Sequence, residues 1–428
     1  MGGGAGMKAW LRSVDNYWFG KGSPTALGVI RILVGFFALL DLLMLSVSFN
    51  DWFGEKSYVP LSLAEKYIDP LDRHFSIFGV EKLFNAHPTL PFTIPRVNLL
   101  TGITSTPLLA IAFGVVCLSA FFTMIGLWTK LSSIVLALGI VSIHHRNGLI
   151  LNGGDTVLRI AVLYLALSPC GLACSVDRLR ALWKGRVGPE APQVSLWTQK
   201  LLQYNLALCY FTTFWLKFGQ GSHWRDLTAT YYAAHINEFQ RFPVPEFMNR
   251  PPVVYLTSIL TLVIELALGT LVFYKPARRW VLLGGLGLHG FIEYSMNIPL
   301  FAFIICSLYV CFYSGEEIAD FFKRVGRAMN KWATVVSLPR GTRLRTSAAN
   351  GLAAVDALGL VLYKPGLSEE LPAQEVKKSW TRSLATWPVG WIPGLWKGVL
   401  TRSLEVNDEP ANKARPEGAA PTVSAQIG

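Results

Sequence analysis

Apolar residues gather in long, nearly uninterrupted runs along the chain, without the strict alternation of a half-buried strand. A helix needs about 20 mostly apolar residues to cross the hydrocarbon core of a bilayer. The third and fifth runs are shorter than this, and we expect both helices to extend into their flanks. The pattern predicts an all-α, polytopic membrane protein with about eight transmembrane helices, over residues 26–47, 108–128, 131–144, 157–174, 201–216, 253–274, 280–294 and 298–313.

The composition agrees with a membrane protein and excludes an ordinary soluble domain. Of the 428 residues, 52% are hydrophobic and 15% are charged, whereas soluble domains carry about 25% charged residues. The net charge of +12 does not indicate nucleic-acid binding, because the basic residues cluster in loops and in the C-terminal third. That distribution fits a face lying on anionic lipid. We therefore expect membrane lipid as a partner and no nucleic acid.

Basic residues also orient the predicted helices. They concentrate in the N-terminal segment and in every second connection, and the positive-inside rule places such segments in the cytoplasm. Both termini of this multi-pass protein are then cytoplasmic. The first apolar run is followed by no small-residue cleavage site, so we interpret it as a retained helix. The basic residues that carry the argument are Lys8, Arg12, Lys21, Lys130, Arg178, Arg180, Lys184, Arg186, Lys200, Lys275, Arg278, Arg279, Lys323, Arg324, Arg327 and Lys331.

The same patterns divide the chain into four parts. Residues 1–25 form a cytoplasmic N-terminal segment and residues 26–314 the membrane domain. Residues 315–406 form a basic region that is partly interfacial, since residues 380–400 hold four tryptophans. Residues 407–428 are rich in Pro, Ala, Glu and Lys and are expected to be disordered.

The six cysteines indicate neither a disulfide framework nor a metal site. All of them lie within or at the ends of apolar runs. Cys170 and Cys174 are four residues apart on a predicted helix, but no histidine or second cysteine pair completes a ligand set. We expect buried apolar thiols and no metal.

Charged residues inside the predicted spans require partners, because each costs about 2.5–3.5 kcal/mol at mid-helix on insertion scales. For Arg31, Asp41 and Glu265 we expect structural pairing between helices. His289 has two open interpretations. It is either a core histidine bonded to a neighbouring carbonyl or a group that lines a proton-transfer cavity.

A polar segment joins the third and fourth predicted spans. Asn152 and two glycines indicate a turn, and Asp155 is placed to cap the helix that follows. We expect Arg146, Asn152 and Asp155 to form a packed outward cap over the bundle. Adjacent residues point in different directions on a helix, so His144 and His145 do not form a metal pair.

Lys217 lies where the fifth apolar run meets the membrane surface. A lysine at a helix end often anchors the helix by extending its ammonium into water, or to an acidic residue such as Asp226 or Glu238. In low-dielectric surroundings, however, the ammonium form is disfavoured and the amine becomes available as a base. Apolar walls from Phe214, Trp215 and Phe218 and a nearby histidine would favour the second interpretation.

Six stretches in order together resemble the HTTM domain, the membrane domain shared with vitamin K-dependent γ-glutamyl carboxylase. Each stretch is weak alone, but the ordered set is specific, and it covers about residues 18–313. The stretches are GVIRILVG at residues 28–35, IGLWTK at 125–130, RN at 146–147 with NGGD at 152–155, KFG at 217–219 with Trp224 and Thr228, ELALG at 265–269, and His289 with MNIPLF at 296–301.

In the carboxylase, a membrane lysine deprotonates reduced vitamin K, and the oxygenated product removes a glutamate γ-proton before carbon dioxide adds. The resemblance implies that Lys217 is that base, although its spacing to the following tryptophan is longer here. It also implies proton-handling or quinol-contacting roles for His145 and His289. The expected cofactor is reduced vitamin K or a related quinol, without a metal. The residues expected to contact the quinol are Arg146, Asn152, Trp224 and Thr228.

The chain departs from the carboxylase after the membrane domain, where a short basic tail replaces a large lumenal domain that grips the substrate. A carboxylase-like enzyme (a carbon–carbon lyase) acting on a secreted polypeptide would then need a partner protein to supply the extracytoplasmic part. The alternative is a non-catalytic maturation factor or scaffold that holds a lipid or a secreted peptide. Lys217→Arg separates the two hypotheses, because arginine keeps the charge but does not serve as a base.

Overall fold

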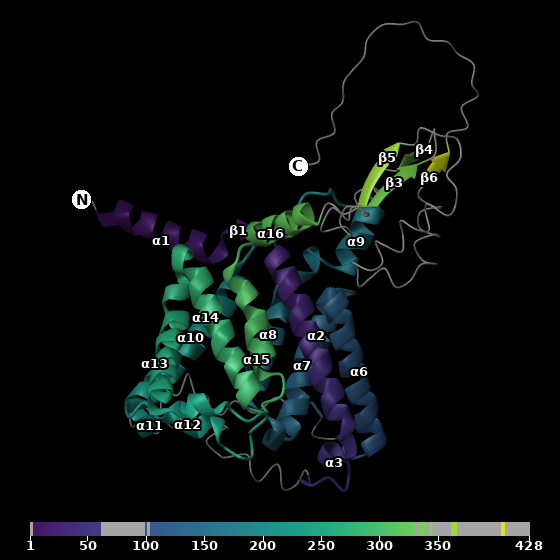
Figure 1. Cartoon of the computed structure of the whole chain (residues 1–428). Coiled ribbons are helices and arrows are strands. Elements are labelled where there is room, and N and C mark those ends of the chain that lie inside the picture. Colours follow the sequence, from purple (N-terminus) through teal and green to yellow (C-terminus); the bar gives the residue numbers. More distant parts are fainter. Residues whose placement is uncertain are drawn as a thin grey trace, which may run out of the picture. The chain divides into compact units, whose positions relative to one another are not determined.

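The computed structural model describes residues 3–60, 99–100 and 103–329, together with four short strands beyond them. The chain divides into two compact units, Met1–Arg324 and Val325–Gly428. The first unit is a helix bundle (Figure 1). The helices that stand side by side in it are α2 (Thr25–Val47), α6 (Thr106–Ile125), α7 (Thr129–Arg146), α8 (Gly153–Leu167), α10 (Trp197–Gln220), α13 (Pro251–Gly269), α14 (Lys275–Ser295) and α15 (Phe301–Leu308).

Shorter helices lie at the two ends of this bundle. Figure 1 shows α3 (Phe49–Phe53), α11 (Ser222–Arg225) and α12 (Ala229–Ala234) at one end, which we call the α12 end. At the opposite end, the α1 end, lie α1 (Gly3–Phe19) and α16 (Gly315–Ala328). The remaining elements of the first unit are α9 (Val176–Trp183), the paired strands β1 (Lys21–Gly22) and β2 (Val194–Ser195), and 3₁₀ turns at Gly148–Ile150, Cys170–Leu172, Glu246–Asn249, Leu271–Phe273 and Tyr309–Phe312.

After the end of α16, the described residues of the second unit form four short strands. β3 (Thr334–Leu338) pairs with β5 (Val361–Pro365) in parallel, and β4 (Thr342–Leu344) pairs with β6 (Leu404–Val406) in antiparallel orientation. The predicted interfacial segment 380–400 and the predicted disordered tail 407–428 lie outside the described residues.

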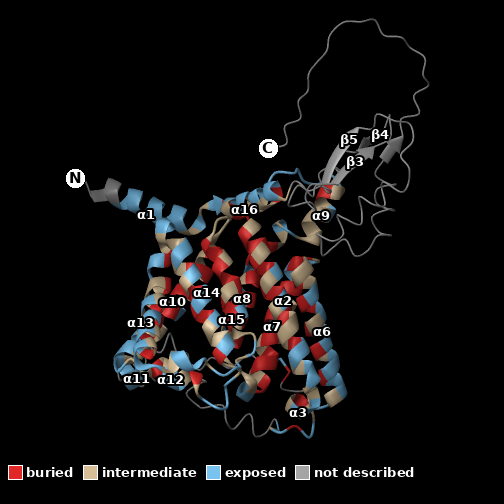
Figure 2. Cartoon of the chain, viewed as in Figure 1, coloured by how far each residue is buried: buried red, intermediate tan, exposed pale blue. Residues whose placement is uncertain are grey.

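Burial in the bundle follows the helix faces (Figure 2). The inward faces are mostly apolar, as at Leu27, Leu136 and Leu158, each 0% exposed. The outward face of α6 is also apolar, since Leu108, Ile111, Val115 and Leu118 are 51–65% exposed. A soluble protein seldom exposes such a continuous apolar stripe, whereas a helix that faces lipid requires one.

Among the described residues, three helices are long and apolar enough to cross a membrane: α2, α6 and α13. A fourth span results if the segments Phe301–Phe312 and Gly315–Ala328, which meet at a bend of 104°, are counted together. Three of the other bundle helices fail this test of length and hydropathy for reasons that are evident in their sequences. α8 has 15 residues, or about 22 Å of helix, and α10 and α14 carry several polar or charged residues in their first turns.

The predicted ranges match these helices with some corrections. The short third and fifth runs extend into their flanks as expected, to Thr129–Arg146 and Trp197–Gln220. The fourth range was placed too late, because its helix begins at Gly153 and ends at Leu167. Pro169 follows, and the residue before a proline is disfavoured in the helical conformation. Cys170 and Cys174 therefore do not share a helix, and Cys174 has a φ of 51°.

Arg31 fixes α2 against the ends of two neighbouring segments. Its side chain is 0% exposed, and its Nη1 donates to the carbonyls of Thr123 (2.6 Å) and Met124 (2.9 Å) at the end of α6. Nη2 donates to the carbonyl of Cys174 at 2.5 Å. The expected interhelical role of Arg31 is confirmed, but its partners are carbonyls at a helix C-terminus, where positive charge is favoured.

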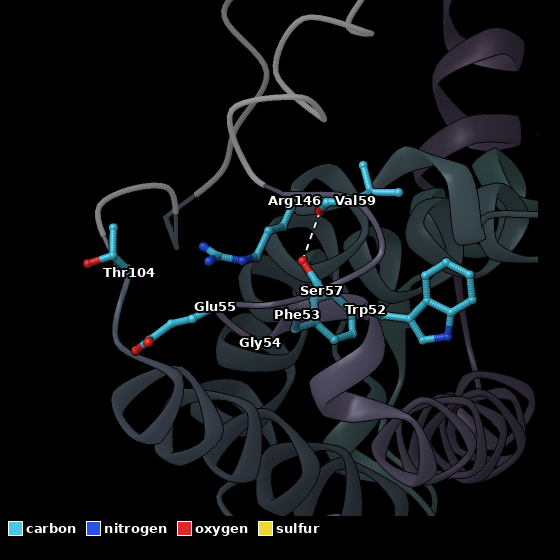
Figure 3. A pocket seen from close by; sticks show the side chains of 8 residues that line it. All are labelled: Trp52, Phe53, Gly54, Glu55, Ser57, Val59, Thr104 and Arg146. Atoms are coloured by element: carbon cyan, nitrogen blue, oxygen red, sulfur yellow. Dashed lines mark hydrogen bonds between the residues drawn. The ribbon is translucent and has the colours of Figure 1, made fainter.

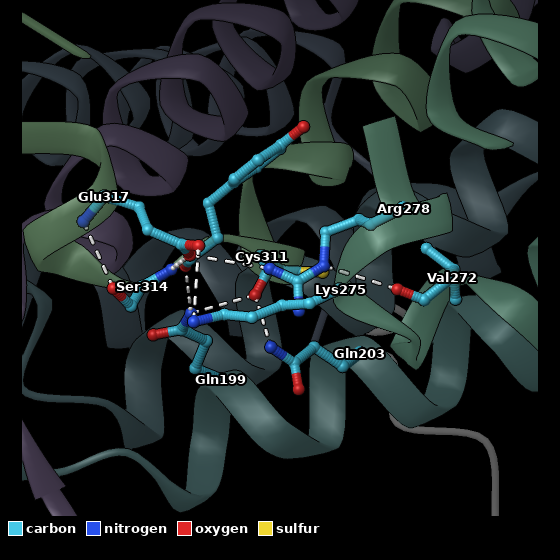
Figure 4. A network of polar contacts seen from close by, with 9 residues as sticks. Gln199, Gln203, Val272, Lys275, Arg278, Cys311, Ser314 and Glu317 are labelled. Carbon is cyan, nitrogen blue, oxygen red and sulfur yellow. Dashed lines mark hydrogen bonds and ion pairs between the residues drawn. The ribbon is translucent and has the colours of Figure 1, made fainter. Parts of the chain in front are cut away.

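A second polar network closes the bundle near the start of α10 (Figure 4). Gln199 Nε2 donates to the carbonyls of Cys311 and Tyr313, both at 2.8 Å, and Gln203 Nε2 also donates to Cys311. Cys311 lies in the 3₁₀ turn Tyr309–Phe312 and Tyr313 follows it, at the end of a helical segment where carbonyls need donors from elsewhere. The two glutamines supply the missing donors, so the polar residues of α10 are explained by the short helix beside it.

Candidate functional site

Lys217 lies in the last turn of α10 and forms an ion pair with Glu265 of α13. Its side chain is 28% exposed, and that of Glu265 is 7% exposed. Its Nζ atom also lies 4.8 Å from the ring centroid of Trp224 in α11, a cation–π contact. The interhelical role expected for Glu265 is confirmed. The acidic partner of Lys217 is this residue, not Asp226 or Glu238.

Aromatic residues surround the lysine on α10. The rings of Phe214 and Phe218 stack with centroids 5.7 Å apart, and Trp215 packs edge-on against both. Trp215 and Phe218 are about half exposed and form part of the apolar surface of the bundle. The lysine–glutamate pair therefore lies between helices and next to an apolar outer face, where water does not compete fully for the charges.

A second polar group lies deeper between the helices, which we call the tyrosine–histidine cluster: Tyr210 of α10, His289 of α14 and Tyr309. The Tyr210 hydroxyl is 2.7 Å from His289 Nε2 and 2.8 Å from the Tyr309 hydroxyl. All three residues are at most 6% exposed. His289 is bonded to a tyrosine hydroxyl, not to a carbonyl as one interpretation of the sequence expected.

The two groups are neighbours. Tyr210 and Lys217 are seven positions apart on α10, two helical turns, and so share a face. The hydrogen bond between Tyr210 and His289 therefore places the imidazole on the side of α10 that carries Lys217. Within the described part of the chain, Glu265 Oε2 and His289 Nδ1 are buried without a hydrogen-bond partner. These two atoms are available to a polar ligand between the helices.

The polar turn before α8 is built as the sequence predicted. The Asn152 side chain accepts from the Gly154 N–H, and the Asp155 carboxylate accepts from the Asn152 N–H, both at 2.6 Å. This reciprocal arrangement is a capping box. Asn152 Nδ2 also donates to the Pro299 carbonyl at 3.3 Å, so the turn binds the segment that precedes α15.

Asn152→Ala should lower the thermal stability of the purified protein more than Asn147→Ala does. The first substitution removes the cap, which is worth about 1 kcal/mol, and the contact with Pro299. Asn147 makes longer bonds: its side chain accepts from the Leu149 N–H at 3.2 Å and donates to the Trp52 carbonyl at 3.4 Å. Melting temperatures in detergent give the comparison, and equal, negligible effects of both variants would show that the turn is a plain connector.

Arg146 belongs to a different part of the α12 end. Its guanidinium donates to the carbonyls of Leu100 (2.6 Å) and Ile103 (2.9 Å). It also lines a cavity of about 270 Å³ (Figure 3). The other lining residues come from the α3 region and the segment before α6: Trp52, Phe53, Gly54, Glu55, Ser57, Val59 and Thr104.

The other predicted site residues lie as follows. Thr228 follows α11, where its N–H donates to the His223 carbonyl at 2.8 Å and its hydroxyl is 3.3 Å from His223 Nδ1. It therefore shares a short segment with Trp224. His145 lies half-buried in the last turn of α7.

His144, not His145, joins a buried cluster of ionisable groups. Ligand atoms of Asp41 on α2, His144 on α7 and Asp155 on α8 all lie within 4.8 Å of one another. His144 Nε2 is 3.3 Å from Asp41 Oδ2. The interhelical pairing expected for Asp41 is confirmed. We call these three residues the aspartate–histidine cluster.

Sequence reasoning did not single out Tyr210, Tyr309 or His144 as site residues. Tyr210 carried a usable signal, because it lies two turns before Lys217 on the same face. The sequence contains no comparable signal for Tyr309 or His144. Apolar runs do not show which of two adjacent histidines faces inward, and Tyr309 reaches Tyr210 across sequence-distant helices.

Comparison with known families identifies the bundle. The model of the HTTM domain matches residues 79–316, more than half of the chain, and the chain belongs to this family. The resemblance inferred from the sequence is therefore confirmed. No curated protein and no solved structure matches the chain. The family and the apolar helices together identify a membrane protein.

Proposed function

We propose that this protein is a carboxylase-like membrane enzyme that uses Lys217 as a base on a lipid-soluble quinol, in order to modify a polypeptide. The supporting observation is the position of Lys217. It is ion-paired with the buried Glu265 and neighbours the tyrosine–histidine cluster, so groups that hold or move protons converge between α10, α13 and α14. The reaction class, glutamate γ-carboxylation or related chemistry, comes from the family resemblance.

Glu265 is the group that prepares Lys217 for this role. The ammonium donates to Glu265 Oε1, and transfer of that proton leaves a neutral amine beside a neutral carboxyl group. Because separated charges are costly in a low-dielectric site, the neutral form becomes accessible when a ligand excludes water. The Lys217 amine would then be free to accept a proton, and Glu265 would hold the proton that the lysine released.

The residues present fit a quinol. Such a molecule is large and apolar with two hydroxyl groups, and sites for it are apolar with few polar groups. The unpartnered Glu265 Oε2 and His289 Nδ1 supply polar contacts, and Trp224 supplies an aromatic wall. When bound, reduced vitamin K or a related quinol would supply, with oxygen, the base that removes a glutamate γ-proton.

The other candidate residues take different parts in the proposal. Thr228 lies beside Trp224 in the segment that covers Lys217 and is proposed to contact the quinol with it. His145 is proposed as a proton-handling group at the α12 end. Arg146 and Asn152 bind backbone carbonyls and would act by shaping the loops around the site.

We propose about eight spans for the bundle, formed by α2, α6, α7, α8, α10, α13, α14 and α15. The α1 end and both termini would then be cytoplasmic, by the distribution of basic residues. The α12 end, with Lys217 and α11, would face outward. A secreted polypeptide would reach the site from that side, and a partner protein would supply the part that grips it.

A cysteine at Ser222, at the start of α11, tests this orientation. In a background without the six native cysteines, Ser222→Cys should react with a membrane-impermeant maleimide on intact cells. Cysteine at Arg180, exposed on α9, is the matched cytoplasmic control and should react only after permeabilisation. The reverse pattern would overturn the topology and the outward-facing site.

Glu265→Gln tests the proton transfer within the lysine–glutamate pair. Glutamine keeps the shape and accepts a hydrogen bond from the lysine, but it does not take up a proton. We expect oxidation of reduced vitamin K by proteoliposomes to fall about 100-fold or more, as for loss of a general base. Folding, followed by size-exclusion chromatography, should be unchanged. Full activity of Glu265→Gln would remove Glu265 from the mechanism.

The alternative is a non-catalytic maturation factor or scaffold. The specific observation that favours it is the ion pair itself, which together with the Trp224 contact pins α10, α11 and α13 to one another. In that case the charge of Lys217 matters and its basicity does not. The lysine-to-arginine comparison in the Discussion separates the two functions.

A further inference from the structure

We propose that Asp41, His144 and Asp155 form a binding site for one divalent transition-metal ion of the Zn²⁺ type. One side chain comes from each of α2, α7 and α8, and their ligand atoms lie within 4.8 Å of one another. No local spacing indicates this metal site, because the three residues are separated by 103 and 11 positions. The site is independent of the proposed quinol chemistry.

The donor set and its spacing suit such an ion. One imidazole nitrogen and two carboxylates are ligands that Zn²⁺ accepts at about 2.0–2.2 Å, which gives a ligand–ligand edge of about 3.3–3.6 Å in a tetrahedron. His144 Nε2 and Asp41 Oδ2 are 3.3 Å apart. This is long for a charge-assisted hydrogen bond, which is about 2.7–2.9 Å, but it matches the tetrahedral edge.

His144 supplies a second observation. Its side chain is 1% exposed, and its Nδ1 atom has no hydrogen-bond partner among the described residues. A buried imidazole normally has partners for both nitrogens. Because Nε2 is the nitrogen that faces Asp41, a metal ion would bind Nε2, and Nδ1 would carry the proton.

Asp155 is held as a metal ligand would be. Its Oδ2 atom accepts the Asn152 N–H at 2.6 Å, which orients the carboxylate and leaves Oδ1 for a further ligand. Hydrogen bonds that orient ligating carboxylates are typical around metals. The N-terminus of α8 thus links the capping box to the site.

Charge gives a reason for a cation. Asp41 and Asp155 place two carboxylates around one largely buried imidazole, with Arg159 one helical turn further along α8. A divalent cation compensates both carboxylates at once. It would also tie three helices together below the Asn152 turn.

The test is metal analysis of the full-length protein purified in detergent. After chelation and dialysis against Zn²⁺, elemental mass spectrometry should find about one equivalent bound, and the melting temperature should rise. Cobalt(II) allows metal binding to the wild-type protein to be followed by absorption, since Co²⁺ in a tetrahedral site shows visible d–d bands. Zn²⁺ should displace it.

Asp41→Asn and His144→Ala should each weaken Zn²⁺ binding at least 10–100-fold. Loss of a residue that only hydrogen-bonds to a metal ligand already has an effect of this size. His235→Ala is the matched control: this histidine directly follows α12, its Nδ1 atom lies 2.7 Å from the Tyr231 carbonyl, and its loss should leave binding unchanged. Absence of both Zn²⁺ and Co²⁺ binding by the wild-type protein would overturn the proposal and leave the cluster as a polar contact between three helices. Binding that survives Asp41→Asn and His144→Ala would overturn it equally.

Discussion

Lys217→Ala is expected to reduce quinol-dependent turnover about 100-fold to 10,000-fold, the range for loss of a general acid–base group, while the protein remains folded. Lys217→Arg should be nearly as inactive. Arginine preserves the charge and the pairing with Glu265, but it does not release its proton in proteins. The measurement is oxidation of reduced vitamin K under oxygen by proteoliposomes, with folding checked by thermal unfolding.

Lys200→Ala is the matched control for this pair of variants. Lys200 lies on the same helix at the opposite end, with its Nζ atom 4.5 Å from the Tyr17 ring, and its loss should leave turnover close to that of the wild type. If Lys217→Arg retains activity while Lys217→Ala does not, the lysine serves only as a cation that holds the helices. Lys217 would then not be the base, whereas absence of turnover even in the wild-type protein would favour the scaffold.

Arg31→Met is expected to destabilise the bundle by about 3 kcal/mol, with loss of folded protein on mild heating. Methionine fills much of the same volume but leaves the carbonyls of Met124 and Cys174 without their donor. Each such buried group costs about 1–3 kcal/mol. Thermal unfolding in detergent measures the effect, and Arg180→Met, at an exposed position of α9, should be close to neutral.

Gly126→Ala is expected to disturb the same contact of Arg31 by a steric clash. Gly126 has a φ of 71°, a conformation that favours glycine, and an added Cβ would lie 2.5 Å from Arg31 Nη1. This variant should therefore also lose stability. If neither Arg31→Met nor Gly126→Ala lowers the melting temperature, the guanidinium does not hold α2 against α6.

The sequence predicted helices and their polar exceptions better than it predicted helix ends. Runs of apolar residues located α2 to within one residue of its start, because hydrophobic periodicity is a local property. The fourth predicted range was wrong at both ends. The helix α8 starts at the cap formed by Asn152 and Asp155 and ends before Pro169. These local signals determine the helix ends more strongly than the apolar residues on either side do.

Partners of the polar residues were harder to predict than their positions. Lys217 and Glu265 were both recognised, but not as a pair, because their contact joins helices 48 positions apart. Likewise, the choice of His144 over His145 depends on which face of α7 meets α2 and α8. Both contacts depend on tertiary packing between helices, which a single sequence does not show.

The central claim, that a quinol binds beside Lys217, is tested most directly by photocrosslinking. A vitamin K analogue that carries a diazirine is added to the full-length protein in lipid nanodiscs, and labelled peptides are identified by mass spectrometry. We predict adducts on the segments that hold Trp224 and Glu265, and their loss when excess vitamin K is added. Adducts found only elsewhere, or labelling that vitamin K does not compete away, would contradict the claim.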